Sequence, residues 1–198
     1  MSSRRERKKQ ETRNKIFTSA MKLFQAGGYD GTTIDMIAEH ADVARGTVFL
    51  HFPSKEAILA HWGQDRMEEM TERREEWDCP ELNCEEKVMR LFRIALAANQ
   101  ESFDLVKIWV KSTLATPTAM IHERQSPVSL KNLMADILEV AQEEGKLKQN
   151  IDPIIAGDML ENIYLHAMQD WVLSEGNWPV EEILTTKIHY LFNGLNQE

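Results

Sequence analysis

The chain has 198 residues, of which 42% are hydrophobic, and this length suits one large core or a small module joined to a larger one. Its longest apolar run is IALAA at residues 94–98, so the sequence predicts neither a transmembrane helix nor a secretory leader and indicates a cytoplasmic protein. The formal net charge of -9, taken as one number, argues against a protein that binds nucleic acid.

The charge, however, is distributed unevenly along the chain. Residues 1–62 hold ten Lys and Arg against seven Asp and Glu, a balance of +3, whereas the remaining residues hold 13 against 25, a balance of -12. The first fifteen residues, MSSRRERKKQETRNK, contain seven basic and two acidic side chains. This asymmetry indicates an N-terminal part that contacts a polyanion, although a solvated basic tail remains the alternative at this point.

Every segment is predicted to be helical, because no alternating run is long enough to form a sheet. The first predicted helix ends at Gly27 and Gly28, and its apolar residues recur at i, i+4, i+7 and i+8: Ile16, Ala20, Leu23 and Phe24. A second short helix follows. Either Thr32 or Thr33 is its N-cap, and Asp35 lies in its first turn in both cases.

The third predicted helix covers residues 44–51 and follows a tight turn. It contains Gly46, which costs a helix interior about 1 kcal/mol relative to alanine, and Pro53 prevents its continuation. Local stability therefore did not select this glycine. Close approach to another surface explains it, and tight packing on the first helix is the structural alternative.

The composition changes from basic to acidic near Ser54, which can cap a long helix running to about Trp77. We therefore expect residues 1–53 to form one domain and residues 54–198 to form another. The second part predicts about five more helices, so the whole chain is expected to be all-α with about nine helices. Two of these later helices are expected to begin at residues 126–127 and at residues 152–153.

Three short helices in about 45 residues, with a tight turn between the second and the third, predict a helix-turn-helix whose third helix enters the DNA major groove. Such a helix presents small or hydrogen-bonding residues outward, and Arg45, Gly46 and Thr47 are residues of this kind. Arg45 can donate to guanine O6 and N7, and Thr47 can contact a thymine methyl group or a phosphate. His51 and Lys55 at the far end can hold phosphates.

The segment GGYDGTTIDMIAEHADVARGTVFLHFPSKEAIL resembles the N-terminal signature of the tetracycline-repressor (TetR) family of bacterial regulators, over roughly residues 12–60 without gaps. In that family a threonine caps the second helix, a Gly-Thr pair opens the recognition helix, and an aromatic-x-His-Phe followed by Lys-Glu closes the motif. The resemblance implies an all-helical homodimer that binds a double-stranded DNA operator. It also implies a C-terminal domain whose small ligand controls the release of DNA.

Carried over onto this chain, the resemblance implies that eight residues contact DNA: Thr33, Ala44, Arg45, Gly46, Thr47, Phe49, His51 and Lys55. Thr33 would be the cap and a phosphate contact. Two positions depart from the family pattern. Phe49 replaces the usual tyrosine, so its hydroxyl contact is lost, and Ala44 replaces a capping serine or threonine worth about 1 kcal/mol. Asp42 can cap in its place.

Two amphipathic segments near the C-terminus predict a dimer interface. Its candidate residues are Ala156, Met159, Leu160, Ile163, Ala167, Leu184, Ile188, Leu191 and Leu195. Two such helices can pair with their symmetry mates in a four-helix bundle, and packing within one chain is the alternative use. The dimer is favoured because a protein that binds a two-fold symmetric DNA site presents two recognition helices about 34 to 36 Å apart.

A pocket for a small-molecule effector is expected inside the second part of the chain. Its large or adaptable candidates are Trp62, Met67, Trp109, Met120, Tyr164, Met168 and Trp171, and its polar candidates are His122, Asn162 and His166. These residue types suit an apolar or amphipathic effector of unknown identity. Plain core packing is the alternative for each of them.

The sequence carries no pattern typical of an enzyme. His166 and Asp170 have the spacing of half a metal site, but no third ligand, nucleophile motif or phosphate-binding loop accompanies them. Cys79 and Cys84 lack a matching pair and are interpreted as reduced loop thiols, so neither a metal nor another cofactor is expected.

The sequence therefore predicts a ligand-responsive, sequence-specific transcriptional regulator that contacts no membrane. We interpret it as a repressor released from a pseudo-palindromic operator by a small molecule. The alternative is a DNA-binding structural or division-control protein that acts through protein contacts.

Overall fold

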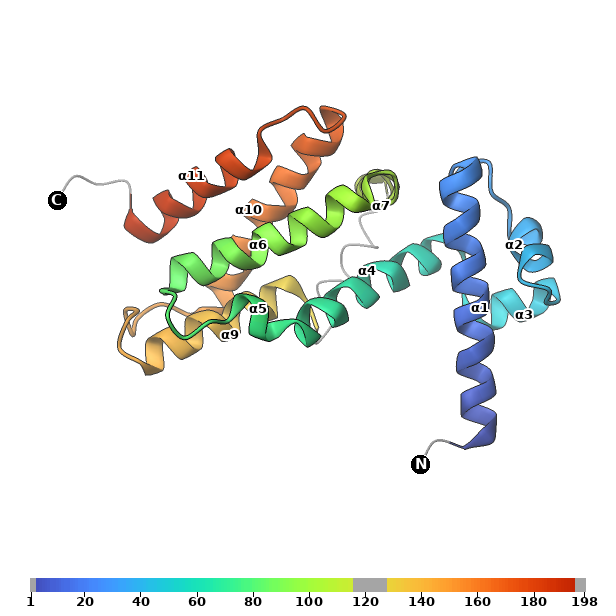
Figure 1. Cartoon of the computed structure of the whole chain (residues 1–198), viewed down its shortest axis with the longest axis horizontal. Helices are drawn as coiled ribbons and strands as arrows, with labels where there is room; N and C mark the ends of the chain where they lie inside the picture. The colour runs from blue at the N-terminus through green and yellow to red at the C-terminus, as the bar shows by residue number, and fades with distance from the viewer. Residues whose placement is uncertain (1–2, 116–127, 195–198) are drawn as a thin grey trace. The chain divides into compact units, whose positions relative to one another are not determined.

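The computed structural model of the chain describes residues 3–115 and 128–194, and every regular element in those ranges is an α-helix (Figure 1). In chain order the helices are α1 (Arg4–Gly27), α2 (Ile34–His40), α3 (Arg45–His51), α4 (Lys55–Glu72), α5 (Arg74–Trp77), α6 (Cys84–Glu101), α7 (Phe103–Ala115), α9 (Leu130–Glu143), α10 (Pro153–Leu173) and α11 (Val180–Asn193). The all-α prediction is confirmed. The described ranges contain one helix more than expected, because the predicted fourth helix is divided into α4 and the short α5.

The chain divides into two compact units, Met1–Gly63 and Gln64–Glu198, and the boundary between them falls inside α4. The first unit contains α1, α2, α3 and the first turns of α4. The functional boundary that the sequence places after residue 53 stays a prediction, because a compact unit is defined by its packing and not by its function. No helix of the described ranges is long and apolar enough to cross a membrane.

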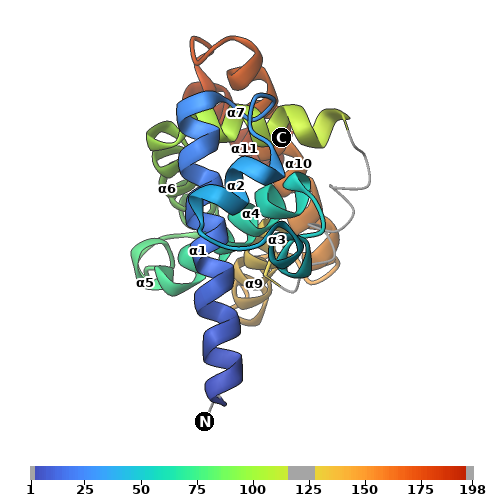
Figure 2. The ribbon, with the colours of Figure 1, turned by 90° about the vertical axis from the view of Figure 1, so that its right-hand side faces the viewer.

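In the first unit, α2 and α3 lie on one side of α1, and the N-terminal turns of α1 project past them (Figures 1 and 2). A capping box starts α1, because Ser3 Oγ accepts from Glu6 N at 3.2 Å while the Glu6 carboxylate accepts from Ser3 N at 2.6 Å. The basic N-terminal run is therefore the beginning of this helix.

The core of the first unit is formed by apolar side chains from all of its helices. These are Ile16, Ala20, Phe24, Ile37, Ala38, Ala41, Val48, Phe52, Ile58 and Leu59. Burying a large side chain of this kind contributes about 1.5 to 3 kcal/mol. Three of the four apolar residues predicted to lie on the inner side of the first helix are in this core, and Leu23 is half-buried.

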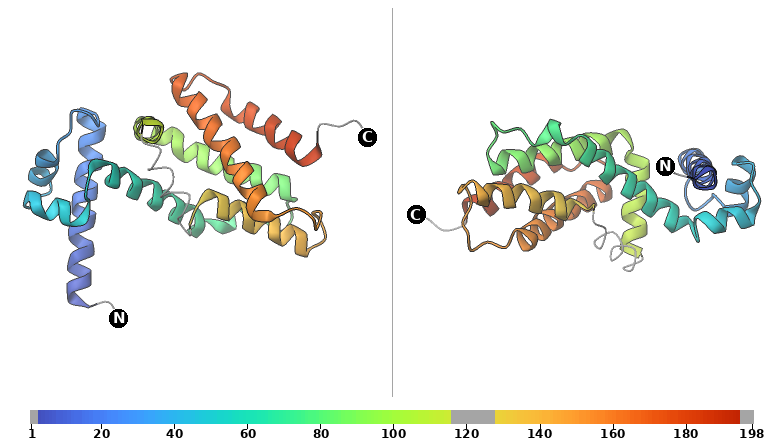
Figure 3. Two further views of the ribbon diagram at one scale, coloured as in Figure 1. Left: turned by 180° about the vertical axis from the view of Figure 1, so that it is seen from behind. Right: turned by 90° about the horizontal axis from the view of Figure 1, so that it is seen from below.

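In the second unit, α10 packs along α9, with α6 and α11 beside it (Figure 3). Gly157 permits the close approach of α10, because a Cβ atom there would lie 2.6 Å from the carbonyl oxygen of Lys131 and 3.1 Å from the backbone nitrogen of Ala135. Any larger residue would push the two helices apart. The core around them includes Val88, Leu91, Phe92, Met134, Leu138, Leu160, Ala167, Leu184 and Ile188.

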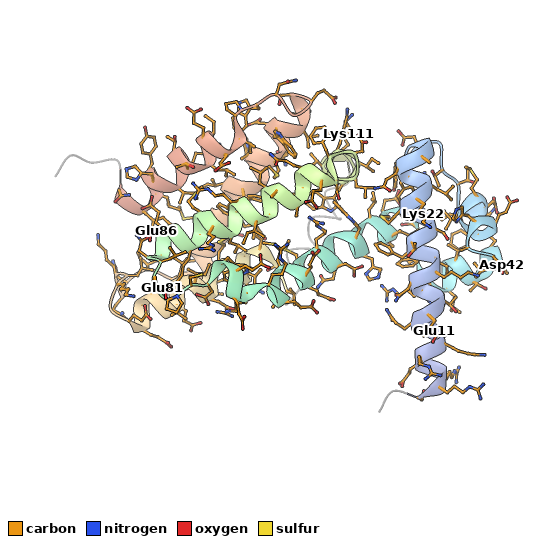
Figure 4. All side chains as sticks on the ribbon, in the orientation of Figure 1. Glu11, Lys22, Asp42, Glu81, Glu86 and Lys111 are labelled. Carbon is orange, nitrogen blue, oxygen red and sulfur yellow. The ribbon has the colours of Figure 1, made fainter. Side chains whose placement is uncertain are left out.

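Side-chain caps set the starts of the helices in the second unit. Asn83 and Glu86 form a capping box at the start of α6, where Glu86 is labelled in Figure 4. Asp152 caps α10, as predicted. Ser129 caps α9, whereas the start predicted at residues 126–127 lies outside the described residues.

Candidate functional site

The start of α2 is fixed by two adjacent threonines with different roles. Thr33 is the N-cap, and its Oγ1 accepts a hydrogen bond from Met36 N at 3.2 Å. Thr32 is buried and donates its hydroxyl to the carbonyl oxygen of Gly28 at 2.8 Å. The structure thus selects Thr33 between the two possible caps and leaves its side chain on the surface.

The turn between α2 and α3 depends on Asp42, whose φ of 50° lies in the left-handed region. Val43 N donates to Ala38 O at 3.0 Å and closes the turn. The expectation that Asp42 caps α3 is wrong. The N-cap residue is Ala44, and no side chain makes a capping hydrogen bond at the start of this helix. The Asp42 carboxylate instead lies 3.5 Å from Lys15 Nζ. The backbone of Asp42 makes the turn in the left-handed region, and its carboxylate lies near Lys15 instead of capping α3.

The outer face of α3 carries a mixed polar and apolar surface. Val48 is fully buried, whereas Arg45 and Gly46 are exposed, Phe49 is 42% exposed and Leu50 is 77% exposed. A Cβ atom at Gly46 would meet no atom within 4 Å. Tight packing on the first helix therefore does not explain this glycine, and its close approach to an external surface stays a prediction.

Arg45 is held in place before any partner is bound. Its Nη1 donates to both carboxylate oxygens of Asp35, at 2.8 Å and 2.6 Å, and its guanidinium lies 5.5 Å from the centroid of the Phe49 ring. Both members of the ion pair are exposed. The contact therefore orients the arginine more than it stabilises the fold, since exposed ion pairs contribute roughly 0 to 1 kcal/mol.

Lys55 makes two hydrogen bonds inside the unit, and its expected role as a phosphate contact stays a prediction. Its Nζ donates to the carbonyl oxygens of Tyr29 at 2.8 Å and of Thr32 at 2.9 Å, and it lies 4.4 Å from the centroid of the Tyr29 ring. Two of the three ammonium hydrogens are thereby occupied. Lys55 ties the start of α4 to the loop that precedes α2.

His51 at the end of α3 is half-buried, and its Nδ1 has no hydrogen-bond partner among the described residues. Burial lowers the pKa of His51, and the nearby charges of Lys9 and Arg13 lower it further. The imidazole is therefore neutral at pH 7. It can contact a phosphate as an N–H donor, without the charge that an imidazolium would bring.

Three of the predicted pocket residues share the inner face of α10. Tyr164, Met168 and Trp171 are each at most 5% exposed. The Tyr164 hydroxyl accepts from Asn99 Nδ2 at 2.9 Å, and its ring stacks on Phe92 at 4.9 Å. Burial raises the pKa of Tyr164, so the phenol stays protonated. Sequence reasoning missed Asn99, the polar residue that α6 contributes to this cluster.

The other pocket candidates that the structure describes differ from this cluster in their unit or in their exposure. Trp62 belongs to the first unit, and Met67 and Trp109 are half-buried in the second. Asn162 and His166 are exposed on the outer face of α10, so the expectation that they orient a ligand inside the bundle is wrong for this packing. Met120 and His122 lie outside the described residues.

The predicted dimer residues are divided between the core and the surface. Four of the predicted interface residues belong to the core of the single chain, because each is at most 1% exposed there: Leu160, Ala167, Leu184 and Ile188. The prediction that these four form the dimer interface is therefore wrong. Met159 is 46% exposed. Ala156, Ile163 and Leu191 are half-buried, and Leu195 lies outside the described residues.

A row of exposed residues follows the outer face of α10, with half-buried residues between its last two members. Its members are Ile155, Met159, Asn162, His166 and Leu173. Helical spacing places them on one side, opposite the buried residues Leu160, Tyr164 and Trp171. Ile155 is 62% and Leu173 67% exposed, so both ends of the row are apolar.

The described residues also define two hollows in the second unit. One, of about 400 Å³, includes Thr71, Leu133 and Ile154 in its lining, and the other, of about 300 Å³, includes Arg66, Arg73, Arg90 and Arg93. None of the eight predicted pocket residues that the structure describes is in the lining of either hollow. No group of three or more His, Cys, Asp or Glu within the described ranges is placed to hold a metal. Burial raises the pKa of the Cys84 thiol to about 11, which disfavours the thiolate that metals bind.

Comparison with known proteins bears on both units. The family model described as "Bacterial regulatory proteins, tetR family" matches residues 16–61, which contain the helix-turn-helix. Thermus thermophilus FadR, a TetR-family transcriptional repressor whose crystal structure is in complex with lauroyl-CoA, superposes with a TM-score of 0.83 at 28% identity, covering 94% of this chain and 96% of that one. The chain belongs to the TetR family of bacterial transcriptional regulators.

Two further proteins resemble this TetR-family regulator over most of its length. The fatty acid metabolism regulator protein of Bacillus subtilis is 23% identical over 194 residues, which cover 92% of this chain and 95% of that protein. The FadR of Bacillus subtilis in complex with stearoyl-CoA has a TM-score of 0.67 at 19% identity, covering 92% of this chain and 99% of that one, which shows a shared fold. As a TetR-family member, the protein is a DNA-binding regulator and belongs to no enzyme class.

Three features of this TetR-family regulator escaped the sequence reasoning. Asp35 was noted only for its place at the helix start, although it holds Arg45, and the exposed apolar Leu50 was not considered. The third feature is the set of arginines that share one hollow. A signal for it was present, because Arg90 and Arg93 lie one turn apart in a strongly acidic part of the chain.

Proposed function

We propose that this regulator is a repressor that binds a pseudo-palindromic operator as a homodimer and leaves it when an acyl-CoA binds to the second unit. The likeness to Thermus thermophilus FadR carries the proposal, because it extends over 94% of the chain and concerns a repressor in complex with lauroyl-CoA. The resemblance to the Bacillus subtilis fatty acid metabolism regulator protein over 194 residues supports the same effector class.

The outer face of α3 supports the DNA-binding part of the proposal. In this proposal Arg45 reads a base edge, Gly46 allows the backbone to approach, and Thr47 and Phe49 contact the groove wall. Thr33 and the neutral His51 donate to phosphates. Lys55 acts from behind by fixing the loop before α2, since its ammonium is already bonded to two carbonyl oxygens.

The exposed row on α10 supports the dimer. A two-fold operator requires two recognition helices, and a closed two-fold dimer uses the same surface on both protomers. Ile155, Met159 and Leu173 would lose water-exposed apolar area there, which favours association. In this proposal Asn162 and His166 serve the interface and not the effector site.

The release of DNA follows from the continuity of α4. This helix begins at Lys55, shortly after α3 ends at His51, and it continues past Gly63 into the second unit. An effector that binds better to a form in which α4 is tilted shifts the population toward that form. A shift of a few ångströms then takes the two recognition helices out of register with successive major grooves.

Selection of binding sites from a random duplex pool, followed by fluorescence anisotropy on the selected duplex, tests the proposal. We expect an inverted repeat to be recovered. Lauroyl-CoA should lower the operator affinity by at least about tenfold, equivalent to a coupling of about 1.4 kcal/mol, while lauric acid alone should not. A pool without enrichment, or an operator complex that is indifferent to every acyl-CoA tested, would contradict the proposal.

The dimer can be tested separately by light scattering after gel filtration. Met159→Glu places a charge in the exposed row of α10 and should shift the protein toward monomer. Met36→Glu is the matched control, because Met36 is 40% exposed and Met159 is 46% exposed, but Met36 lies on α2. Equal masses for the two variants would remove the α10 row from the interface.

A further inference from the structure

Four arginines surround one hollow of about 300 Å³ in the second unit. Arg66 lies on α4, Arg73 directly follows that helix, and Arg90 and Arg93 lie on α6. They are four of the six arginines in residues 64–198, where 13 basic side chains face 25 acidic ones. Like charges repel, so collecting most of the arginines of an acidic unit at one place indicates an anionic partner.

Two of these arginines are bonded to carboxylates through some of their N–H groups and have other N–H groups that could donate to a ligand. Arg73 donates from Nε and Nη2 to the Glu76 carboxylate at 2.8 Å and 2.7 Å, and its Nη1 lies 3.9 Å from Glu69. Arg93 donates from Nε to Glu181 at 2.9 Å, and its Nη groups make no hydrogen bond to any described residue. Since a guanidinium has five N–H donors, both side chains are fixed in position and still able to bind.

Arg90 forms no ion pair with any described residue and is exposed beside the hollow. Its charge nevertheless acts on its surroundings. Arg73 above all, and Arg90 in addition, hold the pKa of Glu76 below its usual value. Arg90 is therefore close to the fixed arginines and has its whole guanidinium available to a ligand.

The lining of the hollow also contains two glutamates and a small apolar surface. Glu69 and Glu101 bring two negative charges against the four positive ones, which leaves +2 in the lining, and the carboxylates of Glu76 and Glu181 paired with Arg73 and Arg93 offset this charge from outside the lining. Ile94, Ala97 and Ala98 lie between the charged groups and take up little room. Guanidinium groups around such a space suit the forked geometry of phosphate oxygens, which arginine binds through paired hydrogen bonds.

We propose that this hollow binds the phosphate groups of the effector, with Arg73, Arg90 and Arg93 as donors. The inference rests on the proposed function, in which the effector is an acyl-CoA, because the CoA part carries a pyrophosphate and a 3′-phosphate. It assigns phosphate recognition to the face shared by α4 and α6. The competing explanation is that the arginines only form exposed ion pairs with neighbouring glutamates, which contribute little to stability.

Isothermal titration of the full-length protein with lauroyl-CoA, free CoA, lauric acid and inorganic pyrophosphate tests this inference. The double variant Arg90→Gln/Arg93→Gln should bind lauroyl-CoA and free CoA at least about tenfold more weakly than the parent, since charge-assisted hydrogen bonds are lost. Its affinity for lauric acid should not change. Arg74→Gln is the matched control, because Arg74 pairs with Asp78 and lies outside the lining. Circular dichroism confirms that each variant keeps its helical content.

The outcomes separate this inference from the proposed function. If the parent and the double variant bind lauroyl-CoA equally well, the phosphate site is overturned and the effector class is kept. The same conclusion follows if the double variant loses affinity for lauric acid by the same factor as for lauroyl-CoA. If the parent does not bind lauroyl-CoA but binds pyrophosphate, and the double variant binds pyrophosphate more weakly, the proposed effector is overturned and the phosphate site is kept. A parent that binds none of the four compounds overturns both.

Discussion

Arg45 and Asp35 are joined through one nitrogen: Nη1 of the arginine donates to Oδ1 of the aspartate at 2.8 Å and to Oδ2 at 2.6 Å. The pair links the first residue of α3 to the first turn of α2. The Nε and Nη2 groups of Arg45 make no hydrogen bond to any described residue, so an anchored arginine keeps donors for a guanine edge. In the proposed function, in which Arg45 reads a base edge, Asp35 is a positioning residue.

Asp35→Asn should strengthen binding to any duplex while it weakens discrimination between sequences. Removing a negative charge beside the phosphates raises non-specific affinity. Loss of the anchor lets Arg45 adopt several rotamers, which reduces the roughly 1 to 3 kcal/mol that a bidentate contact contributes to discrimination. Anisotropy with the operator and a scrambled duplex measures both quantities.

Arg45→Ala is the comparison for this variant. It should lose discrimination at one operator position in each half-site, without the gain in non-specific affinity that removal of an acidic charge brings. If Asp35→Asn binds both duplexes more tightly by the same factor, Asp35 only repels DNA and does not position Arg45.

Gly46→Ala should raise the stability of the protein and lower its affinity for the operator. The added methyl group meets nothing within 4 Å in the chain, and alanine is favoured over glycine in a helix by up to about 1 kcal/mol, a value that applies to the interior and is smaller at the second residue of α3. The same methyl group would stand in the interface if α3 approaches DNA as closely as proposed. Urea denaturation and anisotropy give the two quantities, and an unchanged operator affinity would remove Gly46 from the contact surface.

Gly157→Ala should have the opposite effect on stability, with a loss of about 1 to 3 kcal/mol. The new Cβ would lie 2.6 Å from the backbone oxygen of Lys131, which cannot turn aside as a side chain could, so α10 must move away from α9. Gly46→Ala is the control, because both glycines lie in helices and receive the same substitution. A stability gain in both variants would show that α9 and α10 do not pack this closely.

His51 should make the stability of the protein depend on pH below neutrality. Its folded pKa is lowered from the ordinary value of 6.5, chiefly by burial, so the unfolded chain binds more protons as the pH falls. Stability is therefore complete above 6.5 and is lost as the pH falls from there toward the folded pKa. Urea denaturation at pH values from 8 to 5 should show a smaller loss for His51→Gln, and parallel curves would contradict the prediction.

The helix-turn-helix could be predicted from the sequence because its residues lie at fixed, short spacings. Capping by Thr33, burial of Val48 and exposure of Gly46 are each decided within a few residues of chain. The role of Lys55 could not be predicted in this way. Its two carbonyl partners lie more than twenty residues earlier, and only the folded loop before α2 brings them to its ammonium group.

The second unit was harder to predict because α10 is apolar on most of its circumference. A helix of this kind gives no period that separates the side facing its own chain from the side facing a partner. Leu160 and Ala167 were therefore grouped with Met159, although the structure buries the first two and exposes the third. Asn99 could not be recognised either, because its partner Tyr164 is on another helix.

The hydrogen bonds of Lys55 to two carbonyl oxygens affect how strongly the DNA affinity of the protein should depend on salt. The steepness with which DNA affinity falls as salt rises counts the counterions that protein cations displace from phosphates. A lysine whose ammonium is bonded to two carbonyl oxygens inside the protein should displace fewer counterions than a free lysine, and so should Arg45 while it is paired with Asp35. The regulator should therefore tolerate rising ionic strength better than the ten basic residues among its first 62 indicate.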